Sequence, residues 1–498
     1  MSTRKNIAAN FVGKFWSILS NFLFVPLYIH ILGFDSYSII SFTLVIAGLM
    51  AVLDAGLTAT LSREMARSDT SLDEKISVYR TLESAYFILA AVVLLLILGA
   101  SNLIADKWLN VDAFSNNEVS LFLRIISLDV AFQLLFRFYL GGLFGLEHQV
   151  QANVYQILWG VLRNGLVLVP IVFFPSLNTF FWWQACSTVV ATLLIKAALD
   201  KRLMGRSCFG QPPVLKKEVF SRIWRFALGV LLITMVSSIN TQLDKLAISK
   251  MLSIEVLGHY TLAISLGQGL VILVSPIAAA LLPRLTALYS QKAYKEIDAL
   301  YHTYGMLIAV LVSSVMSILF FFPEEILWVW TGKAALAGEA SIYLPVVAFS
   351  MGMLALAIHP YNIAIANGYT RLNNIMGIVS LVLTIPGYWL AVRYHGALGA
   401  AFVFCIVQTM TLIVYVFLIH RRFMGKVSLF RIYGTEMLLP ILVSMVVAFS
   451  CSFIPATIEG NRWLLLIWIL GAAIVTFCLT SLVFLPVKKV TSLFHQND

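Results

Sequence analysis

Fourteen apolar stretches, each long enough to form a membrane-crossing helix, run through the chain almost from end to end. A helix needs about 20 mainly apolar residues to cross the hydrocarbon core of a bilayer. Of the 498 residues, 60% are hydrophobic and 12% are charged, whereas about 25% are charged in a typical soluble domain. The sequence therefore predicts an all-α integral membrane protein. It excludes a nucleic-acid-binding protein, a disordered chain and a secreted disulfide scaffold.

The first stretch is too long for the core of a signal peptide and no small-residue cleavage site follows it, so we take it as a membrane span. The five cysteines contain no CxxC pair, which argues against a disulfide framework or a metal site. The predicted spans are residues 7–32, 36–61, 82–105, 119–145, 153–174, 178–199, 222–249, 257–282, 303–323, 340–366, 371–392, 396–419, 436–457 and 463–486.

The distribution of basic residues between these spans supports the count and predicts an orientation. With the N-terminus in the cytoplasm, 22 of the 34 Lys and Arg residues fall in inside segments, five in outside loops and seven within spans. Cytoplasmic loops carry such an excess of Lys and Arg, and one missed span would invert every later loop. We therefore expect about fourteen transmembrane helices with both termini in the cytoplasm.

The longest loop, basic and containing Pro212-Pro213, divides the predicted spans. We expect an N-lobe over 1–199, a cytoplasmic linker over 200–221, a C-lobe over 222–420, and two further helices and a tail over 421–498. A shift of 220 residues aligns LGFDSYSIIS with LSIEVLGHYT, at equivalent places in the two six-helix blocks. This weak repeat predicts two pseudo-symmetric lobes plus two C-terminal helices, as in transporters built from parallel repeats. Chance similarity between hydrophobic hairpins is the alternative.

Polar and ionisable side chains inside the spans are the candidate functional residues, because such groups are costly in a bilayer and usually face a cavity or a partner. Several share a helix face; Asp129, Gln133 and Arg137, for example, follow one another at i+4 spacing. The candidates are the cations Lys14, Arg124, Arg137 and Arg163, the acids Asp54, Asp129 and Asp244, and the amides Asn10, Asn21, Gln133, Gln156, Asn164, Asn240 and Gln268.

Each candidate also has a purely structural interpretation. Lys14 could snorkel to the inner surface, and Asp129 and Arg137 could form an ion pair with each other or pair with other helices. Asp54 could hold a helix end or bind a loop arginine. The four candidate cations nevertheless all lie in the first six spans, which predicts a net cationic cavity. Arginine binds phosphate bidentately in a low dielectric, so we expect an anionic, phosphate-bearing substrate and assign the four cations to its binding.

The segment from Asn10 to Arg67 resembles the opening of bacterial polysaccharide-biosynthesis transporters. The shared features are an early Lys in the first span, the LGFDSYS connection and the LDAGL sequence followed by Arg; a further motif, IANGYTR, occurs at Ile365 to Arg371. The sequence is similar to Wzx-type O-antigen flippases of the multidrug/oligosaccharidyl-lipid/polysaccharide exporter superfamily. It departs from their usual pattern at Ser38, where glycine is common.

The resemblance implies that an undecaprenyl-diphosphate-linked oligosaccharide is moved from the inner to the outer leaflet of the bacterial inner membrane. It implies alternating access without a cofactor, driven by a proton or sodium gradient, for which Asp54, Asp129 and Asp244 are the coupling candidates. Expected partners are this lipid-linked oligosaccharide, membrane lipids, and a polysaccharide polymerase and chain-length regulator in the same membrane.

Three alternatives remain. A multidrug or cation antiporter of the same superfamily predicts twelve spans and an acidic cavity. A flippase for the peptidoglycan lipid precursor shares the fourteen spans and the cationic cavity. A membrane enzyme, such as a polymerase or glycosyltransferase, needs a catalytic loop larger than any outer loop in this chain. We therefore do not expect an enzyme.

Overall fold

The structure, a computed structural model, describes residues 16, 20, 22–67, 69–205, 216–367, 369–423, 428–455, 458 and 460–485. Within these residues the chain is almost entirely helical, apart from an isolated bridge between Asn110 and Ser253. In the part of the chain that the structure describes, ten helices are long and apolar enough to cross a membrane. The prediction of an all-α integral membrane fold is therefore confirmed.

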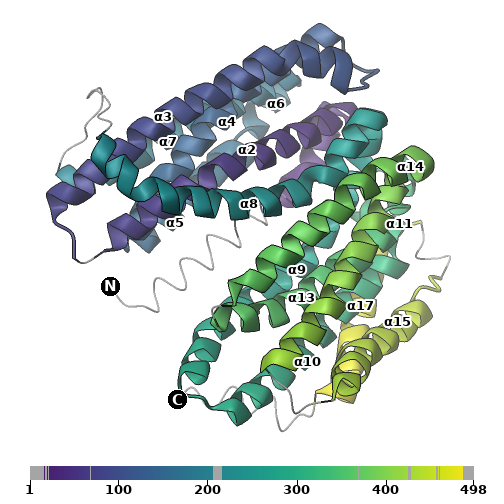
Figure 1. Cartoon of the computed structure of the whole chain (residues 1–498). Helices are drawn as coiled ribbons and strands as arrows, with labels where there is room; N and C mark the ends of the chain where they lie inside the picture. The colour runs from purple at the N-terminus through teal and green to yellow at the C-terminus, as the bar shows by residue number, and fades with distance from the viewer. Residues whose placement is uncertain are drawn as a thin grey trace. The chain divides into compact units, whose positions relative to one another are not determined.

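The chain folds into two compact units, Met1–Gly258 and His259–Asp498. The first unit opens with a short apolar helix, Phe22–Leu32. Its further elements are α2 (Phe34–Ala66), α3 (Leu72–Leu103), η1 (Ile104–Trp108), α4 (Asn116–Gly145), α5 (Gln149–Gly160), η2 (Val161–Gly165), α6 (Leu168–Phe173), α7 (Leu177–Met204) and α8 (Lys217–Met251) (Figure 1).

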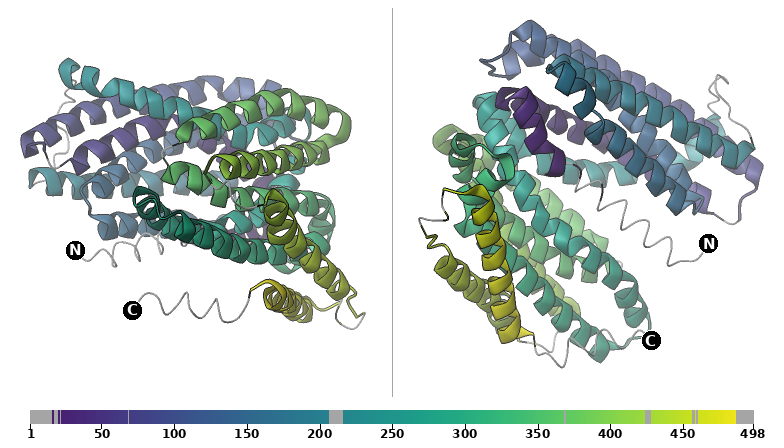
Figure 2. Two further views of the ribbon diagram at one scale, coloured as in Figure 1. Left: turned by 60° about the horizontal axis from the view of Figure 1, so that its bottom comes forward. Right: turned by 180° about the vertical axis from the view of Figure 1, so that it is seen from behind.

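Most of α9 belongs to the second unit, although this helix begins in the first unit. Its elements are α9 (Ile254–Ser290), α10 (Tyr294–Phe321), α11 (Pro323–Thr331), α12 (Ala334–Ser341), α13 (Leu344–Ala366), α14 (Thr370–Phe423), η3 (Arg431–Leu438), α15 (Leu439–Cys451) and α17 (Arg462–Phe484) (Figure 2).

The ten long helices of the described residues do not correspond one to one with the fourteen predicted spans. Helix α14 contains two of the predicted spans, and its backbone leaves helical geometry at Gly396, where φ is +61°. The sequence predicts an interruption between the spans 371–392 and 396–419, and the kink at Gly396 lies there. Glycine adopts positive φ without a Cβ clash. The total of fourteen stays a prediction, and so do the lobe boundaries and the repeat. Helix α8, predicted to open the C-lobe, packs along α2 within the first unit.

Helix α4 lies at the centre of the first unit and packs against α2, α3 and α7. Glycines let the backbones approach closely. A Cβ on Gly141 would lie 2.5 Å from Cγ2 of Thr58, and one on Gly145 would lie 2.4 Å from the carbonyl oxygen of Ser62. Small residues four apart allow this contact between membrane helices. The glycines thus fix α4 against α2 and position the polar side chains that α4 carries.

The start of α2 meets the start of α9 in a similar way, at the residue where this chain departs from the usual family pattern. Ser38 is fully buried, and a Cβ on Gly258 would overlap its hydroxyl and lie 2.9 Å from Cζ of Phe34. The missing Cβ at Gly258 therefore leaves room for the serine.

In the second unit, α10 packs against α15 and α17 (Figure 2). Buried hydroxyls join the three helices, since Ser444 lies 3.0 Å from both Ser313 and Thr480.

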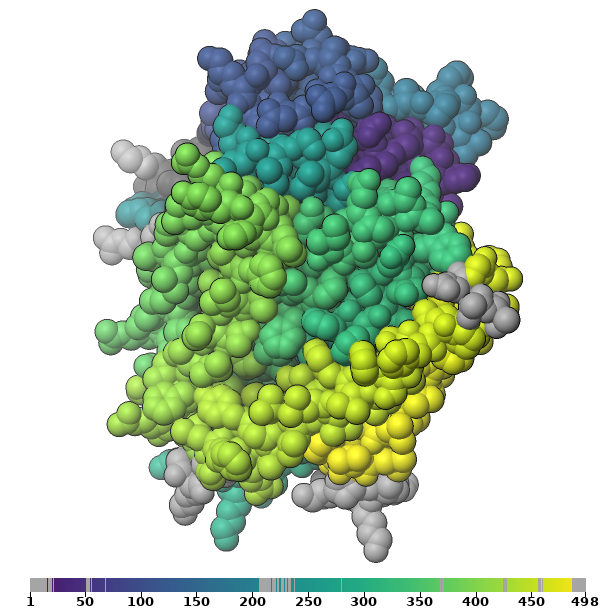
Figure 3. All heavy atoms as spheres, turned by 90° about the vertical axis from the view of Figure 1, so that its right-hand side faces the viewer, coloured from purple at the N-terminus to yellow at the C-terminus, as the bar shows by residue number. Residues whose placement is uncertain are grey.

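Figure 3 shows the C-terminal helices on one face of this unit. The large apolar side chains exposed on these helices and α14 include Val382, Leu383, Leu390, Leu442, Val446, Phe449, Ile467, Leu470, Ile474 and Leu482. Such surfaces suit hydrocarbon rather than water.

Candidate functional site

A buried ion pair joins two of the predicted site residues. Nη1 of Arg163 lies 2.5 Å from Oδ1 of Asp129, and the two side chains are only 15% and 5% exposed. Arg163 follows α5 in the chain and Asp129 lies in the middle of α4, 34 positions earlier. Of the two structural interpretations for Asp129, a pair with Arg137 on its own helix or a pair with another helix, the structure has the second.

Side chains from three segments surround this ion pair and form hydrogen bonds with it or with one another. Gln133, one turn along α4, donates from Nε2 to Oδ2 of Asp129 at 2.9 Å. The hydroxyl of Thr188 on α7 lies 2.7 Å from Oδ1 of Asp129 and accepts from Arg163 at 2.9 Å. The indole of Trp159 also donates to Thr188, and its ring lies 5.6 Å from the guanidinium carbon of Arg163. Nearby partners of this kind are what make a buried charge pair tolerable.

Arg163 lies in the π-turn η2, Val161–Gly165. The amide of Leu166 reaches back five residues to the carbonyl of Val161 at 2.8 Å, so this turn holds one residue more than an α-helical turn. Single π-turns of this type occur often at functional sites. The turn is held from two sides, since Gln184 donates to the carbonyl of Arg163 at 2.9 Å and Tyr28 donates to the carbonyl of Asn164 at 2.6 Å.

Asp54 forms a second cluster, between α2 and α3. Its carboxylate accepts short hydrogen bonds from the hydroxyls of Thr58 and Tyr86, and Tyr86 is fully buried. Arg137 on α4 interacts electrostatically with Asp54. The structure thus gives both central arginines of the first unit an acidic neighbour: Asp129 for Arg163 and Asp54 for Arg137.

The remaining cation and acid candidates lie elsewhere. Arg124 is exposed and donates to Oδ1 of Asn102 at 3.0 Å. Asp244 is buried on α8, and Lys245 lies 3.5 Å from its Oδ1. Lys245 also donates to the carbonyl of Thr241 at 2.9 Å. These residues form contacts separate from the Arg163–Asp129 pair.

Of the predicted amides, Gln133 and Asn164 belong to the Arg163–Asp129 site, where Asn164 donates to Ser20 at 3.2 Å. Gln156 and Asn240 are partly buried, and Gln268 is exposed. Lys14, Asn10 and Asn21 lie outside the described residues. The assignment of all these residues to a substrate path stays a prediction.

A third charged cluster escaped the sequence analysis. Glu83 on α3 pairs with Lys196 on α7, and Lys196 lies 3.6 Å from Asp200 one turn later. Tyr79 and Tyr139 donate to these carboxylates. The signal in the sequence was weak: Lys196 was one of seven cations within spans, whereas Glu83 lies at the start of the predicted span 82–105 and Asp200 at the start of the predicted linker.

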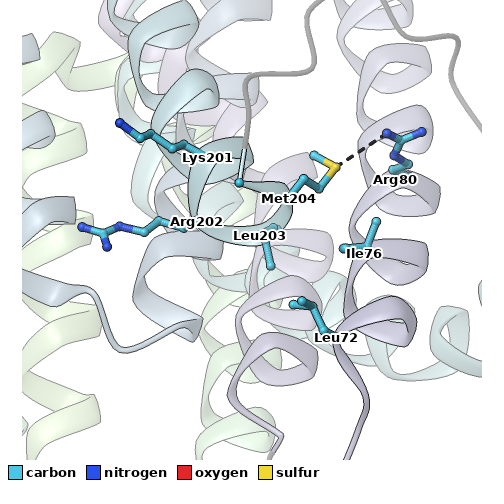
Figure 4. A pocket seen from close by; sticks show the side chains of 8 residues that line it. Leu72, Ile76, Arg80, Lys201, Arg202, Leu203 and Met204 are labelled. Atoms are coloured by element: carbon cyan, nitrogen blue, oxygen red, sulfur yellow. Dashed lines mark hydrogen bonds between the residues drawn. The ribbon is translucent and has the colours of Figure 1, made fainter.

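A pocket of about 530 Å³ opens between the beginning of α3 and the end of α7 (Figure 4). Leu72 and Ile76 form its apolar wall, and Arg80 reaches across to 3.6 Å from the sulfur of Met204. Lys201 and Arg202 extend away from Arg80 in this view. The basic residues at this end are those that the charge distribution predicts to face the cytoplasm.

Comparisons with known proteins agree on a class of transporter. A family model described as "Polysaccharide biosynthesis protein" matches residues 3–289, more than half of the chain. A second model, MatE, matches residues 223–390. A Shigella flexneri protein named "Putative O-antigen transporter" is 19% identical over 375 residues, which cover 74% of this chain and 86% of that protein.

Solved structures show the same fold. The lipid II flippase MurJ, in an inward closed conformation, matches with a TM-score of 0.76 and 12% identity over 97% of this chain and 99% of MurJ. An inward-facing multidrug resistance MATE family transporter of the MOP superfamily matches with a TM-score of 0.67 and 16% identity, over 82% of this chain and 95% of the transporter. The relatives are transporters and flippases rather than enzymes, as the sequence predicts for this chain.

Proposed function

Because the chain belongs to the polysaccharide biosynthesis protein family of MOP-superfamily transporters, we propose that it is a flippase for an undecaprenyl-diphosphate-linked oligosaccharide. The cargo is the repeat unit of an O-antigen or another surface polysaccharide. It moves from the inner to the outer leaflet of the bacterial inner membrane, with both termini of the chain in the cytoplasm. The relative named as an O-antigen transporter supports this class of cargo.

The observation that carries the proposal is the guanidinium of Arg163 in its π-turn, which is only 15% exposed and is paired with Asp129. A lipid diphosphate has to cross a region of low dielectric, where its charge is unstable without a counter-charge. Arginine offers a planar fork of donors that matches phosphate oxygens.

The pairing with Asp129 suggests how cargo and ion are coupled. A phosphate oxygen takes the place of the Asp129 carboxylate on Arg163, so the guanidinium keeps a counter-charge. Asp129 would then be left as a buried anion, which typically costs about 3–5 kcal/mol. A proton or sodium ion that binds Asp129 removes this penalty. The gradient of that ion thereby drives the exchange, and release of the ion restores the Arg163–Asp129 pair after the phosphate has left.

A flippase for the peptidoglycan lipid precursor is the second candidate. The observation in its favour is the similarity to MurJ over nearly the full length of both chains. A precursor of that class also carries a lipid diphosphate, so Arg163 would act in the same way. The family match favours the polysaccharide cargo. A polysaccharide polymerase and a chain-length regulator are the partners expected to receive that cargo.

Mass spectrometry of polyprenyl lipids from cells depleted of this chain tests the proposal. We expect one undecaprenyl-diphosphate-linked repeat unit to accumulate and to disappear again when the wild-type chain is restored. Accumulation of the peptidoglycan precursor would transfer the assignment to the second candidate. An unchanged lipid pool with new sensitivity to cationic dyes would contradict both and indicate a drug exporter.

A further inference from the structure

Basic residues gather in the second unit where the two ends of α14 meet. Residues 340–435 include six Lys and Arg and no Asp or Glu. Helix α14 folds back at Gly396, so that Tyr415 in its second half donates a hydrogen bond to Asn373 in its first half. Three of the six basic residues thereby come to one end of the unit: Arg371, Arg421 and Arg422. The charge distribution predicts that this end faces the cytoplasm.

Arg422 is held against aromatic rings. Its guanidinium carbon lies 4.0 Å from the centre of the Tyr369 ring and 5.7 Å from the centre of the Phe423 ring. The two rings pack edge to face, with centroids 5.9 Å apart. A guanidinium is attracted to the face of an aromatic ring and stacks on it. Such stacking uses the face of the guanidinium and not its five N–H donors, which lie in its plane. Arg422 is thus positioned while its donors stay available.

The three arginines have no carboxylate to neutralise them. Within the described residues, the side chains of Arg371, Arg421 and Arg422 form no ion pair and no hydrogen bond, and all three are exposed. Arg67 and Arg431, at other helix ends, each pair with a carboxylate. The end of α14 therefore presents three positive charges and a preorganised set of donors to a ligand from outside the chain.

A ligand that fits this end carries a phosphate and a hydrocarbon chain. The planar fork of an arginine matches two oxygens of a phosphate, and anionic headgroups attract basic residues that lie next to a membrane span. Apolar side chains are exposed on both halves of α14 close to the arginines, since Ile375, Val414 and Phe417 are 45%, 37% and 39% exposed. Arg422 follows Phe417 by five residues, about 7.5 Å of helix. These apolar side chains suit the chains of a lipid and offer nothing to a free anion.

We propose that Arg422, stacked on Tyr369, binds the phosphate of an anionic phospholipid in the adjacent leaflet of the membrane. The guanidinium donates two parallel hydrogen bonds to the phosphate oxygens, and Arg371 and Arg421 add positive charge around the headgroup. The acyl chains lie along the exposed apolar side chains of α14. This lipid is a resident of the membrane and not the cargo, so the site does not depend on the proposed function.

Native mass spectrometry of the purified full chain, titrated with phospholipid, tests the site without any cargo. We expect the first molecule of phosphatidylglycerol to bind the wild type about tenfold more tightly than phosphatidylcholine, as hydrogen bonds between charged groups provide. Arg422→Gln should abolish this preference. So should Arg422→Lys, because an ammonium keeps the charge but lacks the planar fork. Tyr369→Leu should weaken binding through loss of the stack, whereas Tyr369→Phe keeps the ring face and should bind as the wild type does.

Arg393→Gln is the matched control. It removes the same charge from an exposed arginine of α14 that lies near the kink at Gly396, and it should leave the affinity for phosphatidylglycerol unchanged. Equal weakening by Arg393→Gln and Arg422→Gln would show an effect of net charge and overturn the proposal. A wild type without preference for phosphatidylglycerol overturns it whether or not the variants fold. Displacement of the lipid by an equal concentration of inorganic phosphate would assign the site to a free anion and contradict a lipid site.

Discussion

Arg163 shows how a residue can serve both binding and stability. Its guanidinium is the candidate phosphate ligand, and it also neutralises Asp129 inside the first unit. A simple truncation of Arg163 would therefore confuse a lost contact with cargo and a damaged fold. The loss of cargo binding can be distinguished from the loss of stability only when the Asp129 carboxylate is neutralised together with Arg163.

For this pair we predict a non-additive double-mutant cycle. Arg163→Gln alone should lower the free energy of unfolding by about 3–5 kcal/mol, because Asp129 stays buried and unpaired. Addition of Asp129→Asn should recover most of that loss. Unfolding in mixed micelles measures both values.

Transport by the same double variant distinguishes the two roles. We expect it to reach the membrane at normal levels but to move no cargo, also when combined with Arg137→Ala. Wild-type transport by the stable double variant would rule out Arg163 as the phosphate ligand.

Asp54 depends on Tyr86 for one of its hydrogen bonds. Tyr86→Phe removes a buried donor and should cost about 1–3 kcal/mol of stability, the penalty of an incompletely satisfied buried group. Tyr394→Phe is the control, since Tyr394 is exposed on α14. Equal thermal stability of the two variants would contradict the role of Tyr86 at Asp54.

The sequence predicted which residues belong to the Arg163–Asp129 site, but not how they pair. Polar residues in apolar spans are conspicuous, so Asp129, Gln133 and Arg163 were predicted as candidates. Their pairing was not, because Asp129 and Arg163 are 34 positions apart and helical periodicity relates only residues within one helix. Thr188 escaped because a hydroxyl within a span usually bonds to its own helix. It does so here as well, at the carbonyl of Gln184.

At the scale of elements, small residues decide how closely the helices of the first unit approach. Gly145→Leu places a side chain where the carbonyl oxygen of Ser62 lies. We expect a loss of about 1–3 kcal/mol, as is typical of overpacked cores, visible as a lower melting temperature. Gly99→Ala on α3 is the matched control, because a Cβ there meets nothing within 4 Å. An unchanged melting temperature for Gly145→Leu would show that α4 is not fixed by this contact.

Helix positions were predictable because twenty apolar residues are an unmistakable signal, whereas irregular turns within them were not. The predicted span 153–174 contains α5, the π-turn η2 and α6. The π-turn adds one residue without changing the hydrophobic pattern, so the composition of this segment does not predict it. The break in α14 at Gly396 was predictable, because Arg393 and the following polar residues interrupt the apolar run.

At the scale of the whole molecule, the distribution of Lys and Arg predicts the topology. We expect single cysteines at positions 107 and 333, in a chain without its native cysteines, to react with an impermeant maleimide added to spheroplasts. Cysteines at 292 and 421 should react only after permeabilisation. Labelling of position 292 from outside would contradict the predicted orientation or the span count that precedes it.

The central claim is that this chain moves a lipid-linked oligosaccharide across a bilayer. Reconstitution into vesicles that contain an undecaprenyl-diphosphate-linked repeat unit tests it directly, with an impermeant glycosidase to report which sugars face outward. We predict that the wild-type chain makes the protected half of the pool accessible and that an ion gradient accelerates this. Vesicles with the Arg163→Gln, Asp129→Asn double variant should expose no more of the sugar pool to the glycosidase than protein-free vesicles do. If the folded wild-type chain were no faster than protein-free vesicles, the account would be wrong.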